Sequence, residues 1–341
     1  MPTFFESDLT LQSYWRSIIL YGRNVASYKF ALAKSLINLS QNSNDLIKLE
    51  DLAVPFSDHI CEHLKKNDKQ ITSKNSKFLE TLRDFNHGNI DIGKRNELTK
   101  KLGFNDVINA FHVVNGKPIP NSFFIDERKT NNGVRLTDNF YKLFELRESE
   151  NFLEEVEARW RLVETAWQVG LSIKLTQIKH DKLTGNFVID INKHRRIDVT
   201  SSKSALNGYQ KSKCFFCYDY ISIIKKTKKL CNVDHFFPDM LKGKKFSGYI
   251  DGIWNLVLAC KDCNRGVGGK SAKLPTLKLL ERLQKRNEYF CSSHHPLRET
   301  IMLQTGKTAD ERRSFLQKCY NEAKEILIHN WEPEAKGIET F

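Results

Sequence analysis

The sequence predicts an α+β fold, in which a mainly helical N-terminal region with a small β insertion precedes a C-terminal unit closed by cysteine pairs. Apolar residues recur at helical spacing through much of the first 171 residues. Alternating segments beside turn residues predict short strands within that region. Two C-x-x-C motifs lie between residues 214 and 263, and hydrophobic residues make up 40% of the 341 residues, which excludes a wholly disordered chain.

The first hundred residues are expected to be helical. Residues 1–38 predict one long helix, because apolar residues recur there every three, four or seven positions, with polar residues between them. These residues are Leu11, Trp15, Ile18, Val25, Leu32 and Leu36. A second helix is expected over 43–66, with a break at Pro55, which lacks a backbone N–H. Further helical pattern covers 77–85 and 95–114.

The β insertion is expected within residues 117–136. A strand over 122–128, turn residues at 130–133 and a second apolar segment at 134–136 together predict a hairpin. A long helix is expected to follow at 151–171, because large apolar residues repeat every three or four positions. These residues are Phe152, Val156, Trp160, Val163 and Trp167. Alternation over 186–199 then predicts a strand pair.

A domain boundary is expected near residue 200, where the sequence becomes polar. This boundary divides the chain into a mainly helical region at 1–200, a cysteine-paired unit at 201–290 and a helical extension at 291–341. A helix is expected over 275–289. The last helix, at 309–329, is expected to pack against one of the preceding regions through Phe315, Tyr320, Ala323 and Leu327.

Composition limits the partners and the compartment. The chain has 54 lysines and arginines against 41 aspartates and glutamates, a net charge of +13, which favours nucleic acid or an anionic membrane surface as partner. No apolar run approaches the roughly 18–20 residues that span a bilayer. The first residues lack the pattern of a signal peptide, so we expect a cytoplasmic protein. Its eight cysteines would then stay reduced, and close pairs indicate metal binding.

The two cysteine pairs predict a structural zinc site. Two C-x-x-C knuckles supply four thiolates, which complete a tetrahedral site without an open position. The four residues are Cys214, Cys217, Cys260 and Cys263. The alternatives are buried cysteines that share no metal, or a redox pair, which would need only one C-x-x-C near a βαβ pattern. The pairs are separated by 42 residues, so a further element lies between them.

Polar residues within and after this insert form an ordered series. Asp234 and His235 follow one another on a strand-like apolar run, Asn255 precedes the second pair, and Asn264 follows it. Strand alternation would send Asp234 and His235 to opposite faces unless a bend, such as one near Pro238, brings both to one site. Taken alone, an adjacent Asp and His would be read as a surface ion pair.

Together these elements resemble the HNH nucleases, or ββα-metal nucleases, of the branch with a four-cysteine zinc site. The pattern of that family is C-x-x-C, an Asp-His pair, Asn-Leu, and C-x-x-C-N followed by Gly and Lys. Every element occurs in order across about residues 205–275. Many members end the motif with His where this chain has Asn264, and members with Asn are also known. The resemblance implies a ββα unit and a DNA endonuclease, as in bacterial restriction and antiphage defence enzymes.

The resemblance also implies roles for individual residues. His235 would be the general base, and Asp234 and Asn264 would bind a catalytic Mg2+ or Mn2+ through oxygen ligands. Asn255 would hold the loop that carries His235 through backbone hydrogen bonds. Beside the metal, two basic residues would bind DNA phosphate. These are Arg265 and Lys270.

Two other functions are consistent with the sequence. The nuclease site could be catalytically silent, which would leave a zinc-bearing DNA-binding or scaffold subunit of a larger complex. Glu127-Arg128-Lys129 forms the E-x-K signature of restriction-type nucleases, although no second acidic residue is well placed beside it.

Residues 1–200 would recognise DNA sequence or modification, or bind a protein partner or activator.

The positive charge is concentrated in the motif. Residues 201–286 contain 18 lysines and arginines and six aspartates and glutamates, which account for +12 of the net +13. We therefore expect double-stranded DNA rather than a membrane surface as partner.

Overall fold

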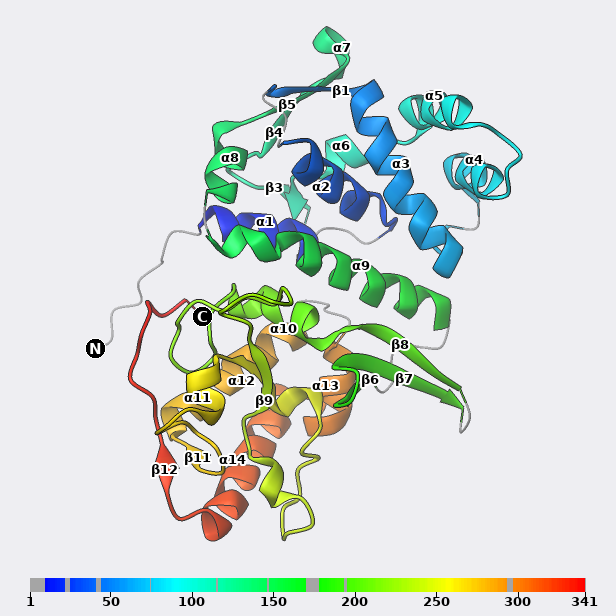
Figure 1. Cartoon of the computed structure of the whole chain (residues 1–341). Helices are drawn as coiled ribbons and strands as arrows, with labels where there is room; N and C mark the ends of the chain where they lie inside the picture. Colours follow the sequence, from blue (N-terminus) through cyan, green and yellow to red (C-terminus); the bar gives the residue numbers. More distant parts are fainter. Residues whose placement is uncertain are drawn as a thin grey trace. The chain divides into compact units, whose positions relative to one another are not determined.

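The computed structural model describes residues 10–21, 25–40, 44–73, 75–114, 116–145, 147–169, 178–192, 195–292 and 297–340 (Figure 1). These residues contain both helices and sheets, as the sequence predicts. The chain divides into two compact units, Met1–Ser149 and Glu150–Phe341. Among the described residues, no helix has both the length and the apolar character needed to cross a membrane.

The first unit is mainly helical and surrounds a small sheet. Its helices are α1 (Leu11–Tyr21), α2 (Tyr28–Leu39), α3 (Leu49–Lys66), α4 (Lys77–Asn86), α5 (Ile92–Leu102), α6 (Val107–Ala110), α7 (Arg128–Asn131) and α8 (Asp138–Phe144). Its strands are β1 (Leu46–Lys48), β2 (Val113–Val114), β3 (Lys117–Pro118), β4 (Phe124–Glu127) and β5 (Gly133–Leu136). The sheet order is β1-β5-β4, and β4 and β5 form the predicted antiparallel hairpin.

Several expectations for the first unit are wrong. The helix expected over 43–66 begins only at Leu49, after strand β1, and the helical pattern expected over 95–114 is divided among α5, α6 and strand β2. Residues 1–38 do not form one helix, because Ala26 forms a β-bridge with Ile71 and ends the helical pattern between α1 and α2. Pro55 does not break α3, which continues through it to Lys66. Apolar side chains on both sides of Pro55 are fully buried, so tertiary packing holds the helix together despite one missing N–H.

Aromatic packing around Trp15 forms much of the first core. The Trp15 side chain is 1% exposed. Its ring lies 5.4–6.1 Å, centroid to centroid, from four phenylalanine rings. These belong to Phe111, Phe123, Phe140 and Phe144. One indole side chain of α1 therefore joins the segments that lead into and out of the small sheet.

The second unit combines a three-stranded sheet with the cysteine-rich segment. Its helices are α9 (Phe152–Val169), α10 (Ser202–Gln210), α11 (Lys261–Arg265), α12 (Leu277–Ser292), α13 (Arg298–Thr305) and α14 (Ala309–Ile326), with short 3-10 turns η1 (Arg147–Asn151), η3 (Asp239–Leu241) and η4 (Ile253–Asn255). Its strands are β6 (Ile178–Asp181), β7 (Asn186–Asn192), β8 (Arg195–Ser201), β9 (Asn232–His235), β10 (Leu256–Ala259), β11 (Leu274–Pro275) and β12 (Asn330–Trp331).

The boundary expected near residue 200 lies inside this second unit. Phe187 of β7, Val199 of β8 and Leu206 of α10 belong to the same hydrophobic core as Cys214. The polar stretch at 200–204 contains the end of β8 and the start of α10, and it does not separate two domains. The C-terminal helices also share this core through Leu316 and other buried residues, so they do not form a separate extension.

The cysteine-rich segment contains two antiparallel strands followed by a helix. Strands β9 and β10 pair with Leu256 opposite His235, and α11 begins directly after β10. Helix α14 packs on this region, where the Phe315 ring lies 4.9 Å from that of Trp254. The order of β9, β10 and α11 is the ββα order that the resemblance implies.

Replacing Trp15 with alanine should lower the free energy of unfolding of the first unit by about 3–5 kcal/mol, because a fully buried aromatic leaves a cavity that its neighbours cannot fill. Chemical denaturation measures this change. Ile92→Ala is the matched control, since Ile92 lies in the same unit and is 55% exposed. A loss below about 1 kcal/mol in Trp15→Ala would contradict the central place of this ring.

Candidate functional site

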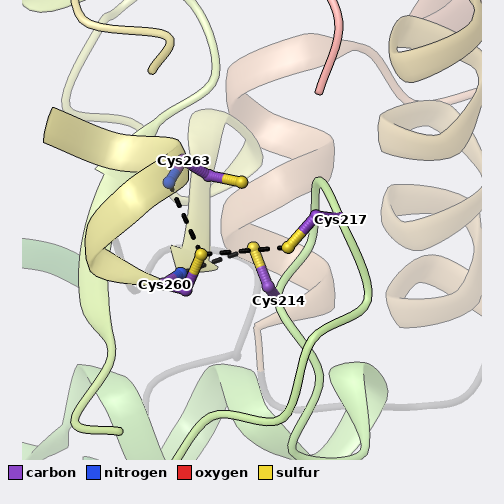
Figure 2. A group of neighbouring side chains, drawn as sticks. All are labelled: Cys214, Cys217, Cys260 and Cys263. Atoms are coloured by element: carbon purple, nitrogen blue, oxygen red, sulfur yellow. Dashed lines mark hydrogen bonds between the residues drawn. The ribbon is translucent and has the colours of Figure 1, made fainter. Parts of the chain in front are cut away.

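Four cysteines from two separate segments meet in the second unit. Cys214 and Cys217 lie in the turn after α10, whereas Cys260 and Cys263 lie at the N-terminus of α11. Figure 2 shows the four side chains turned toward one another. Their Sγ atoms all lie within 4.8 Å of one another, and all four residues are buried. The structure therefore brings together the cysteines that the sequence pairs.

The geometry of this group fits a tetrahedral metal ion. Zn–S bonds of about 2.3 Å place sulfur atoms about 3.8 Å apart. The Sγ atoms of Cys217 and Cys260 are 3.8 Å apart. Backbone N–H groups also point at the sulfurs: that of Cys260 donates to Cys214 Sγ at 3.3 Å, and that of Cys263 donates to Cys260 Sγ at 3.4 Å. Such donors stabilise thiolates.

Electrostatics favours a cation in this group. Burial raises the pKa of the Cys214 thiol, because a thiolate loses its hydration there. Four neighbouring sulfurs can all be thiolates only if a positive charge compensates them. The group could therefore hold a metal such as zinc, with four protein ligands and no open position. Arg282 donates to the carbonyl oxygens of Phe215 and Phe216, the two residues between Cys214 and Cys217, at 2.7 and 3.0 Å.

Asn255 holds the loop that follows His235. Its side-chain amide donates to the carbonyl oxygens of Phe237 and Ile250 at 3.1 and 2.9 Å. Its Oδ1 accepts a hydrogen bond from the N–H of Phe237 at 2.8 Å. Asn255 is fully buried and lies outside the pocket described next. These contacts are those of a residue that shapes the loop without touching a substrate.

A pocket of about 670 Å³ gathers the other polar residues of the motif. Its lining includes Asp234, His235, Asn264, Arg265 and Lys270. Although alternation along β9 would separate Asp234 from His235, both line this pocket, and Asp234 Oδ1 accepts the N–H of His235 at 2.8 Å. The pocket also receives residues that the sequence analysis did not select. These are His180, Lys182, Lys203 and Asp239.

Asp234 has an oxygen suited to a cation. The residue is 8% exposed, and Oδ2 has no hydrogen-bond partner among the described residues. Lys270, itself 1% exposed, places Nζ 3.4 Å from this oxygen. Burial raises the pKa of Asp234 and lowers the pKa of Lys270, so the pair does not fully offset the burial of its two charges. A divalent ion at Oδ2 would supply the missing compensation.

Backbone hydrogen bonds connect the cysteine group with residues of the pocket. Asn264 lies one residue after Cys263, and its N–H donates to the carbonyl oxygen of Cys260 at 3.1 Å. The N–H of Lys270 donates to the carbonyl oxygen of Cys263 at 2.8 Å. Asn264 and Lys270 are therefore positioned by backbone contacts with the second cysteine pair.

The His235 imidazole is uncharged at neutral pH. Burial lowers its pKa to about 4, so the imidazole is neutral near pH 7. Its Nε2 lies 3.0 Å from Oδ1 of Asp251, a residue that the motif does not contain. Asp251 is one of four aspartates in the insert, and its position four residues before Asn255 did not distinguish it from the others. His180 and Lys182 gave no signal, because they come from the preceding sheet.

A second group of potential ligands lies beside His235. His235, Asp239 and Asp251 offer nitrogen and oxygen atoms within 4.8 Å of one another. The ammonium groups of Lys182 and Lys242 each lie 2.7 Å from Asp239 Oδ1. They also lie 3.2 and 2.7 Å, respectively, from the carboxylate of Asp251. Two lysines therefore neutralise the two carboxylates, which disfavours a cation in this group.

The E-x-K signature does not form a site. Strand β4 ends at Glu127, and Arg128 begins the helical turn α7, so Lys129 is not on the same strand as Glu127. The Glu127 carboxylate pairs with Arg135 at 2.8 Å. The carboxylate is already neutralised, and it lies in the first unit, whereas the motif residues lie in the second.

Comparisons with known proteins add no further assignment: no family model, no curated protein and no solved structure matches the chain.

The purified protein should contain one zinc ion, and Cys260→Ser should lose it and destabilise the second unit. Structural zinc sites contribute about 10–16 kcal/mol, comparable with the whole stability of a domain. Metal analysis and thermal unfolding measure both effects. Cys231→Ser is the matched control, because Cys231 is buried in the same core outside the group. Equal zinc loss in both variants would contradict the assignment.

Proposed function

We propose that this protein is a metal-dependent DNA endonuclease of the HNH type. One observation carries the proposal: a single pocket gathers Asp234, His235 and Asn264 beside a β9–β10–α11 unit and a buried four-cysteine group. The residues were selected from the sequence for their chemistry, and they line one pocket. The resemblance to HNH nucleases agrees with this arrangement.

The residues divide the chemistry of phosphodiester hydrolysis among them. His235, neutral at pH 7, takes a proton from the attacking water. Asp234 and Asn264 would hold Mg2+ or Mn2+ through oxygen atoms. Oδ2 of Asp234, which has no hydrogen-bond partner among the described residues and lies 3.4 Å from the Lys270 ammonium group, fits this role. The bound ion supplies stabilisation of negative charge on the phosphate and on the leaving oxygen.

Two cations at the pocket are suited to DNA phosphate. Arg265 is exposed and Lys203 is half-buried, both line the pocket, and neither forms an ion pair with a described residue. Lys270 is different, because its ammonium group is buried against Asp234. A phosphate contact at Lys270 therefore stays a prediction, whereas the exposed guanidinium group of Arg265 is available to bind a phosphate. The net charge of +12 over 201–286 favours double-stranded DNA as the partner.

Residues 1–200 would select the target or gate the cut. Residues 1–149 contain 21 lysines and arginines and 18 aspartates and glutamates, so the first unit is close to neutral. A nearly neutral unit would recognise DNA by a few placed contacts, or bind a protein partner or activator. A role in restriction or antiphage defence in the bacterial cytoplasm is the biological setting that we propose.

A specific contact also favours the second candidate function. The Lys270 ammonium group lies 3.4 Å from Asp234 Oδ2, where it already provides a positive charge. If it excludes a divalent ion, the protein is a zinc-bearing DNA-binding or scaffold subunit without catalysis. Metal-dependent cutting distinguishes the two functions.

The protein should nick plasmid DNA in the presence of Mg2+ or Mn2+, and His235→Ala should lower the rate about 10²–10⁴-fold through loss of the general base. Gel analysis of plasmid conversion measures the rate. His329→Ala is the control, because His329 is exposed in the same unit and outside the pocket. Equal nicking by wild type and His235→Ala would reject the mechanism, and no nicking by either would favour the silent scaffold.

DNA binding should weaken steeply with salt, because lysines and arginines displace counterions from phosphates. Arg265→Ala should reduce the slope of log affinity against log salt by about one, as expected for one lost phosphate contact. Fluorescence anisotropy with a duplex in EDTA measures binding without cutting. Lys66→Ala, an exposed lysine of the first unit, should leave the slope unchanged. A flat titration would argue against a phosphate-binding surface.

A further inference from the structure

We propose that Asp251 is the positioning residue for His235: its carboxylate accepts the Nε2–H of the imidazole and leaves Nδ1 as the nitrogen that takes the proton from water. This inference rests on the proposed nuclease function and deepens it, since it assigns a residue that the motif does not contain. A neutral imidazole carries one N–H, and the nitrogen that accepts the proton must be the other.

The contact itself determines which nitrogen carries the hydrogen. His235 Nε2 and Asp251 Oδ1 are 3.0 Å apart, and the two side chains are only 14% and 20% exposed. Burial raises the pKa of Asp251, but hydrogen bonds from Lys242 and Lys182 outweigh it and bring that pKa below its ordinary value. The carboxylate is therefore ionised and can only accept. The hydrogen between the two residues must come from His235 Nε2.

Asp251 is held in place by two lysines from different segments. Lys242 follows the η3 turn and places Nζ 2.7 Å from Asp251 Oδ2. Lys182 follows strand β6 and places Nζ 3.2 Å from Oδ1. Asp239 joins the same two ammonium groups. The sheet that precedes the motif therefore contributes directly to the orientation of the general base.

Stability alone does not account for this network. Its members are 20–56% exposed, and ion pairs at such positions contribute about 0–1 kcal/mol. Removal of Asp251 should therefore change folding little. The carboxylate instead orients the imidazole, because it holds Nε2 in a hydrogen bond while His235 lines the pocket beside Asp234.

Nitrogen NMR of histidine-labelled protein tests the inference without relying on activity. The chain has ten histidines, and His235→Gln identifies the signal of His235 by its loss. In the metal-free wild type the coupling pattern should show hydrogen on Nε2. In Asp251→Ala that preference should weaken to the mixture of tautomers that an unrestrained imidazole adopts. Asp251→Glu should restore it in part, because glutamate offers the same acceptor at a longer reach. Asp219→Asn, which removes a lysine-paired carboxylate elsewhere in the unit, should leave the pattern unchanged.

Cleavage kinetics provide the second readout. Asp251→Ala should lower kcat roughly 10–100-fold, the usual range for partners that orient a functional histidine, with KM for DNA unchanged. Asp251→Glu should recover part of the rate. A hydrogen on Nδ1 in the wild type, or an unchanged pattern and rate in Asp251→Ala, would overturn the inference.

Two further outcomes are separable. Addition of Mg2+ should leave hydrogen on His235 Nε2, whereas its loss would assign a metal to His235, Asp239 and Asp251 and overturn the inference. If the wild type does not cut DNA, the proposed function fails. The spectrum alone then shows whether Asp251 holds the imidazole in the state inferred here.

Discussion

The buried four-cysteine group is the constraint on which the second unit depends. It joins two segments separated by 42 residues, and its geometry and burial fit a metal such as zinc. A cross-link of this kind removes much of the entropy of a long loop. It also fixes the N-terminus of α11, the helix that carries Cys260, Cys263 and Asn264.

The same constraint extends into the pocket through the backbone. The carbonyl oxygen of Cys263 accepts the N–H of Lys270, and that of Asn264 accepts the N–H of Ser271 at 3.2 Å. Asn255 holds the loop after His235 by binding the backbone of Phe237 and Ile250. The four-cysteine group and a buried amide thus position side chains on short strands and turns. A binding or catalytic site requires side chains that their surroundings hold in a fixed geometry.

Charge is distributed so that each polar group in the pocket has a different environment. Asp234 is buried, and one of its oxygens has no hydrogen-bond partner in the described part of the chain, whereas two lysines keep Asp251 ionised. His235 lies between the pocket and Asp251 and is neutral because burial disfavours its cation. Arg265 stays exposed at the rim. The candidate metal ligand Asp234, the candidate proton acceptor His235 and the candidate phosphate contact Arg265 are therefore distinct, as the proposed hydrolysis requires.

The residue pattern predicted the cysteine group from its strict spacing, and it selected five of the residues that line the pocket. The order of two strands and a helix followed from the resemblance to HNH nucleases. The residue pattern was not sufficient where distant segments meet. The bridge between Ala26 and Ile71 separates α1 from α2, and packing on both sides carries α3 through Pro55. Asp251 contacts His235, and Lys182 contacts Asp251, although neither residue belongs to the motif. Such contacts follow from long-range packing, which no short-range periodicity encodes.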